Sequence, residues 1–83
     1  MSTKLFVGSL PWSVNDDVLK EAFEKHGNVV SAKIVLDRDT RRSRGFGFVE
    51  MENNADAVKA IREMNDSSFN GRNIVVNLAK QRN

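Results

Sequence analysis

Residues 44–51 read Arg-Gly-Phe-Gly-Phe-Val-Glu-Met, and this segment decides how the rest of the sequence is interpreted. Side chains in a β-strand alternate between two faces. One face here carries both charges and both aromatic rings: Arg44, Phe46, Phe48 and Glu50. The other face carries glycine and apolar residues: Gly45, Gly47, Val49 and Met51. Because burying two charges would be costly, the face with the valine and the methionine must turn toward the core. Phe46 and Phe48 are therefore predicted to project from the uncovered side.

The sequence on either side of this segment predicts strands and helices in the order βαββαβ. Strand-like runs lie at residues 4–9, 29–36, 44–52 and 73–78. In residues 29–36, alternation predicts that Lys33 and Val35 face outward and that the opposite face, with Val30, Ala32, Ile34 and Leu36, turns inward. Apolar residues recur at helical spacing in two stretches, which contain Val18, Leu19, Ala22 and Phe23, and then Ala57, Ala60, Ile61 and Met64. Asn15 is a candidate cap for the first helix, and Asn53 or Asn54 for the second. Residues 37–43 form a predicted polar hairpin loop.

This order predicts an α+β, ferredoxin-like βαββαβ sandwich, in which a four-stranded antiparallel sheet has both helices on one face. The 83 residues are expected to form a single domain, with a core at about residues 4–79 and a short C-terminal tail at 80–83. Because both helices cover the same face, the other face of the sheet is left open. The side chains that the strands display there are expected to determine the function.

Aromatic and basic side chains are predicted to share this open face. In residues 4–9 the same alternation turns Leu5 and Val7 inward and leaves Lys4 and Phe6 outward. Three phenylalanine rings would then lie beside Lys4 and the arginine at position 44. Flat rings among cations suit single-stranded nucleic acid, because bases stack on rings for about 1–3 kcal/mol each and cations pair with phosphates. Bases paired in a duplex cannot present their faces in this way.

The two strand motifs resemble those of the RNA-recognition-motif family. Residues 44–51 match the family's octamer except at Met51, where Phe or Tyr is usual, and residues 5–10, Leu-Phe-Val-Gly-Ser-Leu, resemble its hexamer. The resemblance covers essentially the whole chain and implies a single-stranded RNA partner. It also implies that Phe6 and Phe46 stack with bases, that Phe48 contacts sugars or a base, and that Arg44 pairs with phosphate. Residues 37–51 and 70–77 resemble single-domain plant glycine-rich and bacterial RNA-binding proteins, without the glycine-rich tail.

Five further residues are predicted RNA contacts. They are Lys33 on the second strand, Asn77 and Lys80 near the end of the last strand, and Arg41 and Arg42 in the hairpin loop. Simple solvation is the alternative for Asn77 and for the loop arginines. The loop residue before Arg42 stands where relatives usually have glycine. If that position needs a positive φ, arginine costs roughly 1 kcal/mol or the loop changes shape.

Four other side chains are given roles in packing. Phe23 and Phe69 are predicted to lie in the core. Trp12 is expected to pack over the edge of the core, and a further stacking ring beside the bound strand is the alternative. His26 is expected to interact with carbonyl groups at the end of the first helix.

Composition argues against several other classes of protein. The net charge of +2 is modest, and without cysteine there is neither a disulfide nor a thiolate metal site. One histidine and the loop carboxylates Asp37 and Asp39 supply no catalytic, metal or cofactor site, so no enzyme is predicted. No signal peptide or membrane span is evident. The protein is therefore expected to be intracellular, cytoplasmic and monomeric.

Two alternative functions share the predicted fold. A protein-interaction module could use the helices or a modified sheet, but such modules tend to lose the aromatic residues on the open face. Single-stranded DNA would obey the same stacking and charge rules as RNA, and only contacts to the 2′-hydroxyl would separate the two ligands.

Overall fold

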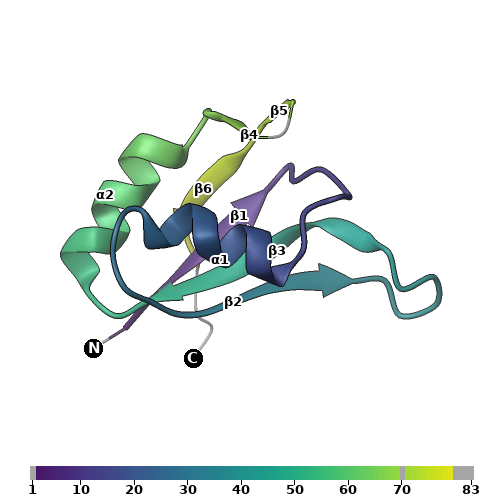
Figure 1. The fold of residues 1–83 in the computed structure, drawn as a ribbon, viewed down its shortest axis with the longest axis horizontal. Coiled ribbons are helices and arrows are strands. Elements are labelled where there is room, and N and C mark those ends of the chain that lie inside the picture. The colour runs from purple at the N-terminus through teal and green to yellow at the C-terminus, as the bar shows by residue number, and fades with distance from the viewer. Residues whose placement is uncertain (1, 70, 80–83) are drawn as a thin grey trace.

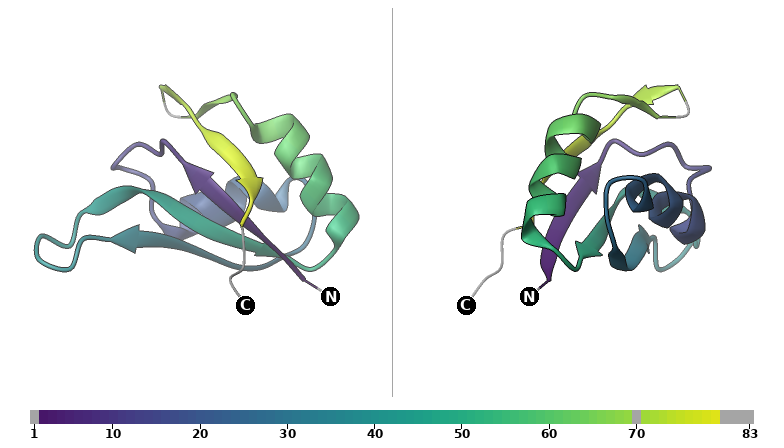
Figure 2. Two further views of the ribbon diagram at one scale, coloured as in Figure 1. Left: turned by 180° about the vertical axis from the view of Figure 1, so that it is seen from behind. Right: turned by 60° about the vertical axis from the view of Figure 1, so that its left-hand side comes forward.

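The structure, a computed structural model, describes residues 2–69 and 71–79. A four-stranded antiparallel sheet in the order β2-β3-β1-β6 carries helices α1 and α2 on one face (Figures 1 and 2). The elements are β1 (Thr3–Gly8), α1 (Asp16–Glu24), β2 (Val29–Leu36), β3 (Ser43–Met51), α2 (Asn54–Met64), β4 (Ser68–Phe69), β5 (Arg72–Asn73) and β6 (Val75–Leu78). The predicted ferredoxin-like fold is confirmed, and the two motif-bearing strands, β1 and β3, lie at its centre.

Local side-chain hydrogen bonds define where both helices begin. The Asn15 side chain accepts from the Val18 N–H at 2.8 Å, and the Asn53 side chain accepts from the Ala55 N–H at 2.9 Å. Both residues satisfy N–H groups that the first turn of a helix leaves without a partner. The predicted cap at Asn15 is confirmed, and Asn53 rather than Asn54 caps α2.

The core lies between the helices and the inward face of the sheet. Its fully buried members include Leu5, Val7, Leu19, Phe23, Val49, Met51, Ala57, Ala60 and Ile74. The predicted inward faces of β1 and β3 and the burial of Phe23 are therefore confirmed. Phe69 is only partly buried, and it packs against the edge of this cluster rather than within it.

The predicted inward face of β2 is wrong at both of its ends. Val30 and Leu36 are 55% and 52% exposed, whereas Ile34 between them is buried. The pairing of β2 with β3 shifts register between Val29 and Ser31, and again between Ile34 and Leu36. Such irregularities rotate the strand, so Val29 packs against the core in place of Val30.

The last predicted strand is shorter than expected, because its first residues form a separate hairpin. Strand β5 pairs with β4, with Ser68 opposite Asn73. Strand β6 joins the main sheet only at Val75, which pairs with Gly8 at the end of β1. Strand β1 ends at Gly8, so residues 72 and 73 do not pair with it and pair with β4 instead.

The β2–β3 hairpin contains a strained residue. Arg41 has a φ of 63°, in the left-handed region that favours glycine, and its N–H donates to the Asp37 carbonyl at 3.0 Å. The predicted condition for strain is therefore met, since the hairpin holds arginine at a positive φ.

Arg41→Gly is expected to raise the free energy of unfolding by about 0.5–1 kcal/mol, because glycine adopts a positive φ without the Cβ clash. Urea denaturation followed by circular dichroism measures the change. Arg42→Gly is the matched control, since Arg42 is not among the positive-φ residues and glycine there should be neutral or destabilising. Equal effects of the two substitutions would contradict the assignment of strain to Arg41.

Candidate nucleic-acid interface

The open face of the sheet carries one row of side chains that crosses all four strands. Lys33 pairs with Phe48, Phe48 with Phe6, and Phe6 with Asn77. Residues directly opposite each other on neighbouring strands project from the same face. Two aromatic rings therefore occupy the middle of the row, with an ammonium group at one end and an amide at the other.

Phe46 extends the aromatic surface along β3. The Phe6 ring centroid lies 5.8 Å from that of Phe46 and 6.0 Å from that of Phe48, and the latter two centroids are 6.2 Å apart. All three side chains are half-buried, because the rings lean against one another. The inter-ring angles of 31°, 67° and 90° are those of tilted and edge-to-face pairs. The cluster is held in place while part of each ring remains accessible.

Gly8 determines how the Phe6 ring lies on the sheet. A Cβ atom at Gly8 would lie 2.8 Å from Cε2 of the Phe6 ring, so the ring rests over this glycine. Any side chain at this position would push the ring away from the sheet. Because Gly8 has no side chain, the Phe6 ring lies against the sheet above it, and the opposite face of the ring points outward.

Two cations lie over these rings. The Lys4 Nζ atom is 4.9 Å from the Phe48 centroid, and the Arg44 Cζ atom is 5.9 Å from the Phe46 centroid. Both distances fall within the range of cation–π interactions. Positive charge is therefore already placed at the edge of the surface on which bases would stack.

Glu50 gives the open face an acidic group at the end of β3 opposite Arg44. It pairs with Lys4 across β1 and β3, and its carboxylate accepts a hydrogen bond from the Ser2 hydroxyl. A carboxylate repels phosphate, so the face is electrostatically asymmetric along β3. The Arg44 end is the more favourable one for a polyanion.

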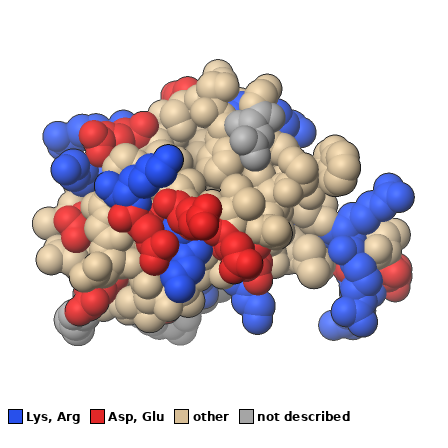
Figure 3. Space-filling view, in the orientation of Figure 1, with Lys and Arg blue, Asp and Glu red and all other residues tan. Residues whose placement is uncertain are grey.

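The β2–β3 hairpin projects beyond the sheet, and its arginine side chains form a basic cluster with acidic groups beside them (Figure 3). Arg41 and Arg42 are exposed on this loop rather than beside the aromatic rings. The Asp37 carboxylate shapes the loop by accepting from the N–H groups of Asp39 (2.8 Å) and Thr40 (3.1 Å). These backbone hydrogen bonds, with a smaller contribution from the positive charge of Arg44, lower the pKa of Asp37 below its ordinary value.

The structure brings most of the predicted site residues together on the open face. They are Phe6, Phe46, Phe48, Lys4, Lys33, Arg44 and Asn77. Lys80 lies outside the described residues. The contacts of all these residues with a nucleic acid stay predictions.

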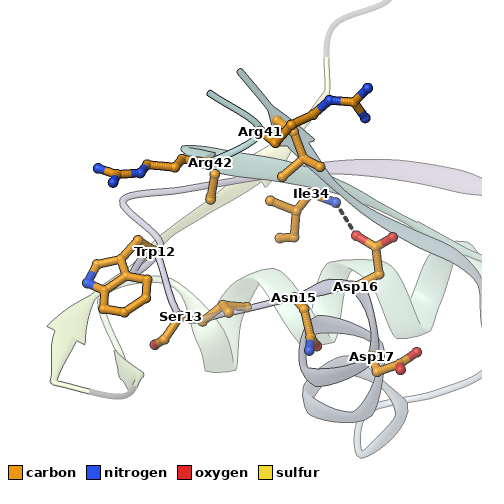
Figure 4. A pocket seen from close by; sticks show the side chains of 11 residues that line it. Trp12, Ser13, Asn15, Asp16, Asp17, Ile34, Arg41 and Arg42 are labelled. Atoms are coloured by element: carbon orange, nitrogen blue, oxygen red, sulfur yellow. Dashed lines mark hydrogen bonds between the residues drawn. The ribbon is translucent and has the colours of Figure 1, made fainter. Parts of the chain in front are cut away.

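The prediction that Trp12 packs over the core edge is wrong, because its side chain is 84% exposed. It borders a groove of about 920 Å³ between the β1–α1 loop and the β2–β3 hairpin (Figure 4). Leu36, which was predicted to face the core, also lines this groove. Alternation does not reveal either position, because Leu36 follows a register shift between β2 and β3 and Trp12 lies in a loop outside the strands.

His26 has its predicted role through its backbone, because its N–H donates to the Phe23 carbonyl near the end of α1 at 3.0 Å. The sequence did not reveal the role of its ring, whose Nδ1 atom lies 2.9 Å from the Glu63 carboxylate on α2. Among the residues that the structure describes, no group of three or more His, Asp or Glu side chains could hold a metal ion. None of the helices in the described part of the chain is long and apolar enough to cross a membrane.

Comparison with known proteins points to one family. The family model described as "RNA recognition motif" matches residues 5–75. A mitochondrial glycine-rich RNA-binding protein 2 of Arabidopsis thaliana is 51% identical over 82 residues, which are 99% of this chain and 52% of the relative. A chloroplastic 31 kDa ribonucleoprotein of Nicotiana sylvestris is 47% identical, over 98% of this chain and 26% of the relative. The chain thus spans about half or less of the length of these relatives.

Solved structures agree with the sequence comparison. The crystal structure of RNA Binding Protein PG1 is 43% identical, has a TM-score of 0.92 and covers 98% of both chains. The first two RRM domains of the yeast poly(U)-binding protein Pub1 match with a TM-score of 0.90 and 35% identity, over 96% of this chain and 48% of theirs. The predicted cytoplasmic location receives no support, since the names of relatives include mitochondrial and chloroplastic proteins.

Asp37→Ala is expected to destabilise the protein at neutral pH, because two loop N–H groups lose their acceptor. The lowered pKa of Asp37 means that its contribution is fully present above the ordinary value of 3.8 and is lost as the pH falls through the folded-state value. The difference in unfolding free energy between wild type and variant should therefore shrink under strongly acidic conditions. Urea titrations across the pH range test this, and a difference that stays constant into acid would contradict it.

Proposed function

Because the chain belongs to the RNA-recognition-motif family, we propose that it binds single-stranded RNA across the open face of its sheet. The bases stack on Phe6 and Phe46, Phe48 contacts a sugar or a base, and Arg44 and Lys4 pair with phosphates. The observation that carries this proposal is the cluster of three phenylalanine rings on the face of the sheet opposite α1 and α2, with a cation over two of them.

The aromatic cluster is suited to unpaired bases. A base that stacks on a ring must expose its own face, which happens in single strands and not within a duplex. At about 1–3 kcal/mol for each stacked base, two occupied rings supply a substantial part of micromolar binding. The relatives' names describe RNA-binding proteins and ribonucleoproteins, which favours RNA over DNA as the ligand.

The cations over the rings have a second role when RNA binds. A base that stacks on Phe46 occupies the ring face that the Arg44 guanidinium now approaches at 5.9 Å. The guanidinium then turns to the neighbouring phosphate, and Lys4 does the same beside Phe48. The Glu50 carboxylate repels phosphate at its end of β3, so the sugar–phosphate backbone of the RNA runs closer to Arg44.

Asn77 and Lys33 flank the stacked bases at the two ends of the cross-strand row. The Asn77 Oδ1 atom already accepts from the Leu78 N–H at 2.8 Å. Its amide N–H groups remain to donate to a base acceptor such as a carbonyl oxygen. Lys33, paired with Phe48, contributes a further phosphate contact. Asn77 is thus one open-face residue that could discriminate among bases by hydrogen bonding.

The double substitution Phe46→Ala with Phe48→Ala is expected to weaken RNA binding at least tenfold, because stacking is lost. Fluorescence anisotropy with a labelled pool of eight-nucleotide, random-sequence RNA measures affinity, and a DNA pool of the same length tests the preference for RNA. Val58→Ala, at an exposed position of α2, is the control and should bind as wild type.

Both aromatic side chains lie outside the buried core, so the double variant should keep its helical circular dichroism and unfold cooperatively. Unchanged RNA affinity in this folded variant would contradict the proposed site. Stronger binding of the DNA pool would instead assign the face to single-stranded DNA.

Arg44→Ala is expected to reduce the slope of log K against log salt concentration by about 0.7, the value for one phosphate contact to a single strand. The measurement is RNA affinity between about 50 and 200 mM salt. Arg62→Ala on α2 removes the same charge from the helix side and should leave the slope nearly unchanged. Equal slopes for Arg44→Ala and wild type would remove Arg44 from the interface.

A further inference from the structure

The sheet has two free edges, formed by β2 and β6, because these strands lie at the two ends of the order β2-β3-β1-β6 (Figure 1). The outer side of an edge strand presents backbone N–H and C=O groups with which another extended chain can pair. Folded proteins therefore protect such edges with side chains, bulges or covering segments. The two edges of this sheet are protected in different ways.

Side-chain amides occupy the outer side of β6. The Val76 N–H donates to the Asn65 side chain at 3.0 Å, and the Leu78 N–H donates to the Asn77 side chain at 2.8 Å. These N–H groups lie two residues apart, so both point away from β1. An added strand would have to displace both side chains, and the β6 edge is therefore blocked at successive positions.

A carboxylate from α1 occupies one position on the edge of β2. The Ile34 N–H donates to Oδ1 of Asp16 at 2.7 Å (Figure 4). This N–H points away from β3, so Ile34 and its partner Gly47 form a non-hydrogen-bonded pair of the antiparallel ladder. By alternation, the N–H of Ala32, two residues earlier, points to the same free edge. Asp16 thus covers a donor that a further strand would use.

The rest of β2 shows why this position matters. Register shifts at both of its ends leave residues 31–34 as the regularly paired stretch of the strand. Irregular ends hinder the addition of another strand, whereas a regular stretch does not. Val30 and Leu36, on either side of this stretch, are about half exposed and would bury apolar surface against a partner. The edge of β2 is therefore suited to association unless the Asp16 carboxylate occupies it.

The start of α1 holds Asp16 in position. Asp16 is the first residue of the helix and directly follows the N-cap Asn15, whose side chain accepts from the Val18 N–H at 2.8 Å. The next residue, Asp17, is exposed and lies away from Ile34 in Figure 4. Two aspartates of equal charge thus stand in the first turn, and Asp16 is the one that contacts the strand.

We propose that Asp16 guards the β2 edge, and that its hydrogen bond to Ile34 prevents a second copy of this chain from pairing there. Two unguarded copies would pair antiparallel through β2, each contributing the same surface, and such an interface closes on itself. Because the β6 edges of the pair stay occupied, association would stop at a dimer. The proposal concerns the free protein and does not depend on RNA binding by the open face.

Asp16→Ala is expected to form dimers as the protein concentration rises, whereas the wild type stays monomeric, and sedimentation velocity measures both states. Asp17→Ala is the matched control, since it removes the same charge from the same turn and should stay monomeric. Asp16→Asn should stay monomeric as well, because its amide oxygen still accepts from the Ile34 N–H. The pair of Asp16 variants thus separates the hydrogen bond from the charge.

Amide hydrogen exchange followed by NMR tests the contact itself. In Asp16→Ala at low protein concentration, the Ile34 N–H is expected to exchange about fivefold faster, the equivalent of one hydrogen bond. In Asp17→Ala it should exchange as in the wild type. Asn53→Ala is the control for lost stability, because it removes the cap of α2 and leaves β2 untouched, and it should stay monomeric.

Dimers of Asp16→Ala, with native helical circular dichroism and faster exchange at Ile34, would support the guard. A monomeric Asp16→Ala at every concentration would overturn it, and so would dimers of the wild type. Equal dimer formation by Asp17→Ala would assign the effect to charge, and by Asn53→Ala to partial unfolding, and either result also overturns the proposal. Unchanged exchange at Ile34 in Asp16→Ala would do the same, because the contact would then not protect the edge.

Discussion

The pleat of β3 is the constraint on which the rest of this structure depends. With Val49 and Met51 fully buried against the helices, the alternation of side chains leaves Phe46 and Phe48 no orientation except outward. Gly47 lets the neighbouring strand approach on the inward side, since a Cβ atom there would lie only 2.5 Å from the Lys33 carbonyl oxygen. The close pairing with β2 in turn places Lys33 beside Phe48. One residue pattern thus sets both the packing of the sheet and the composition of its open face.

This arrangement separates the residues that stabilise the fold from those proposed to bind RNA. Phe23 is completely buried on α1, whereas the three open-face phenylalanines pack mainly against one another and the sheet surface beneath them. Exposed aromatic area of this kind adds little to the stability of the free domain and favours a ligand with flat faces. Substitutions of the open-face rings are therefore expected to leave the core intact.

Features that depend on residues a few positions apart were predictable from the sequence. Features that depend on contacts between segments distant in the sequence were not. The outward rings of β1 and β3 and the cap at Asn15 follow from residues a few positions apart. The exposure of Val30 and Leu36 follows from register shifts against β3, which no pattern within β2 reveals. Trp12 belongs to the same class, because its position depends on the hydrogen bond between Leu10 and Gly45, residues far apart in the sequence.

The distribution of charge explains why a net charge of only +2 is compatible with a polyanionic ligand. Repulsion by carboxylates acts over about a Debye length, roughly 8 Å at physiological salt, so distant acidic groups on the helices matter little at the open face. At one end of β3 the repulsion of phosphate by Glu50 is offset in part by Lys4, which is its cross-strand partner, whereas at the other end Arg44 attracts phosphate. On the proposed function, the backbone of a bound strand is therefore expected to run nearer the Arg44 end of β3. This expectation rests on a few charges beside the rings rather than on the net charge.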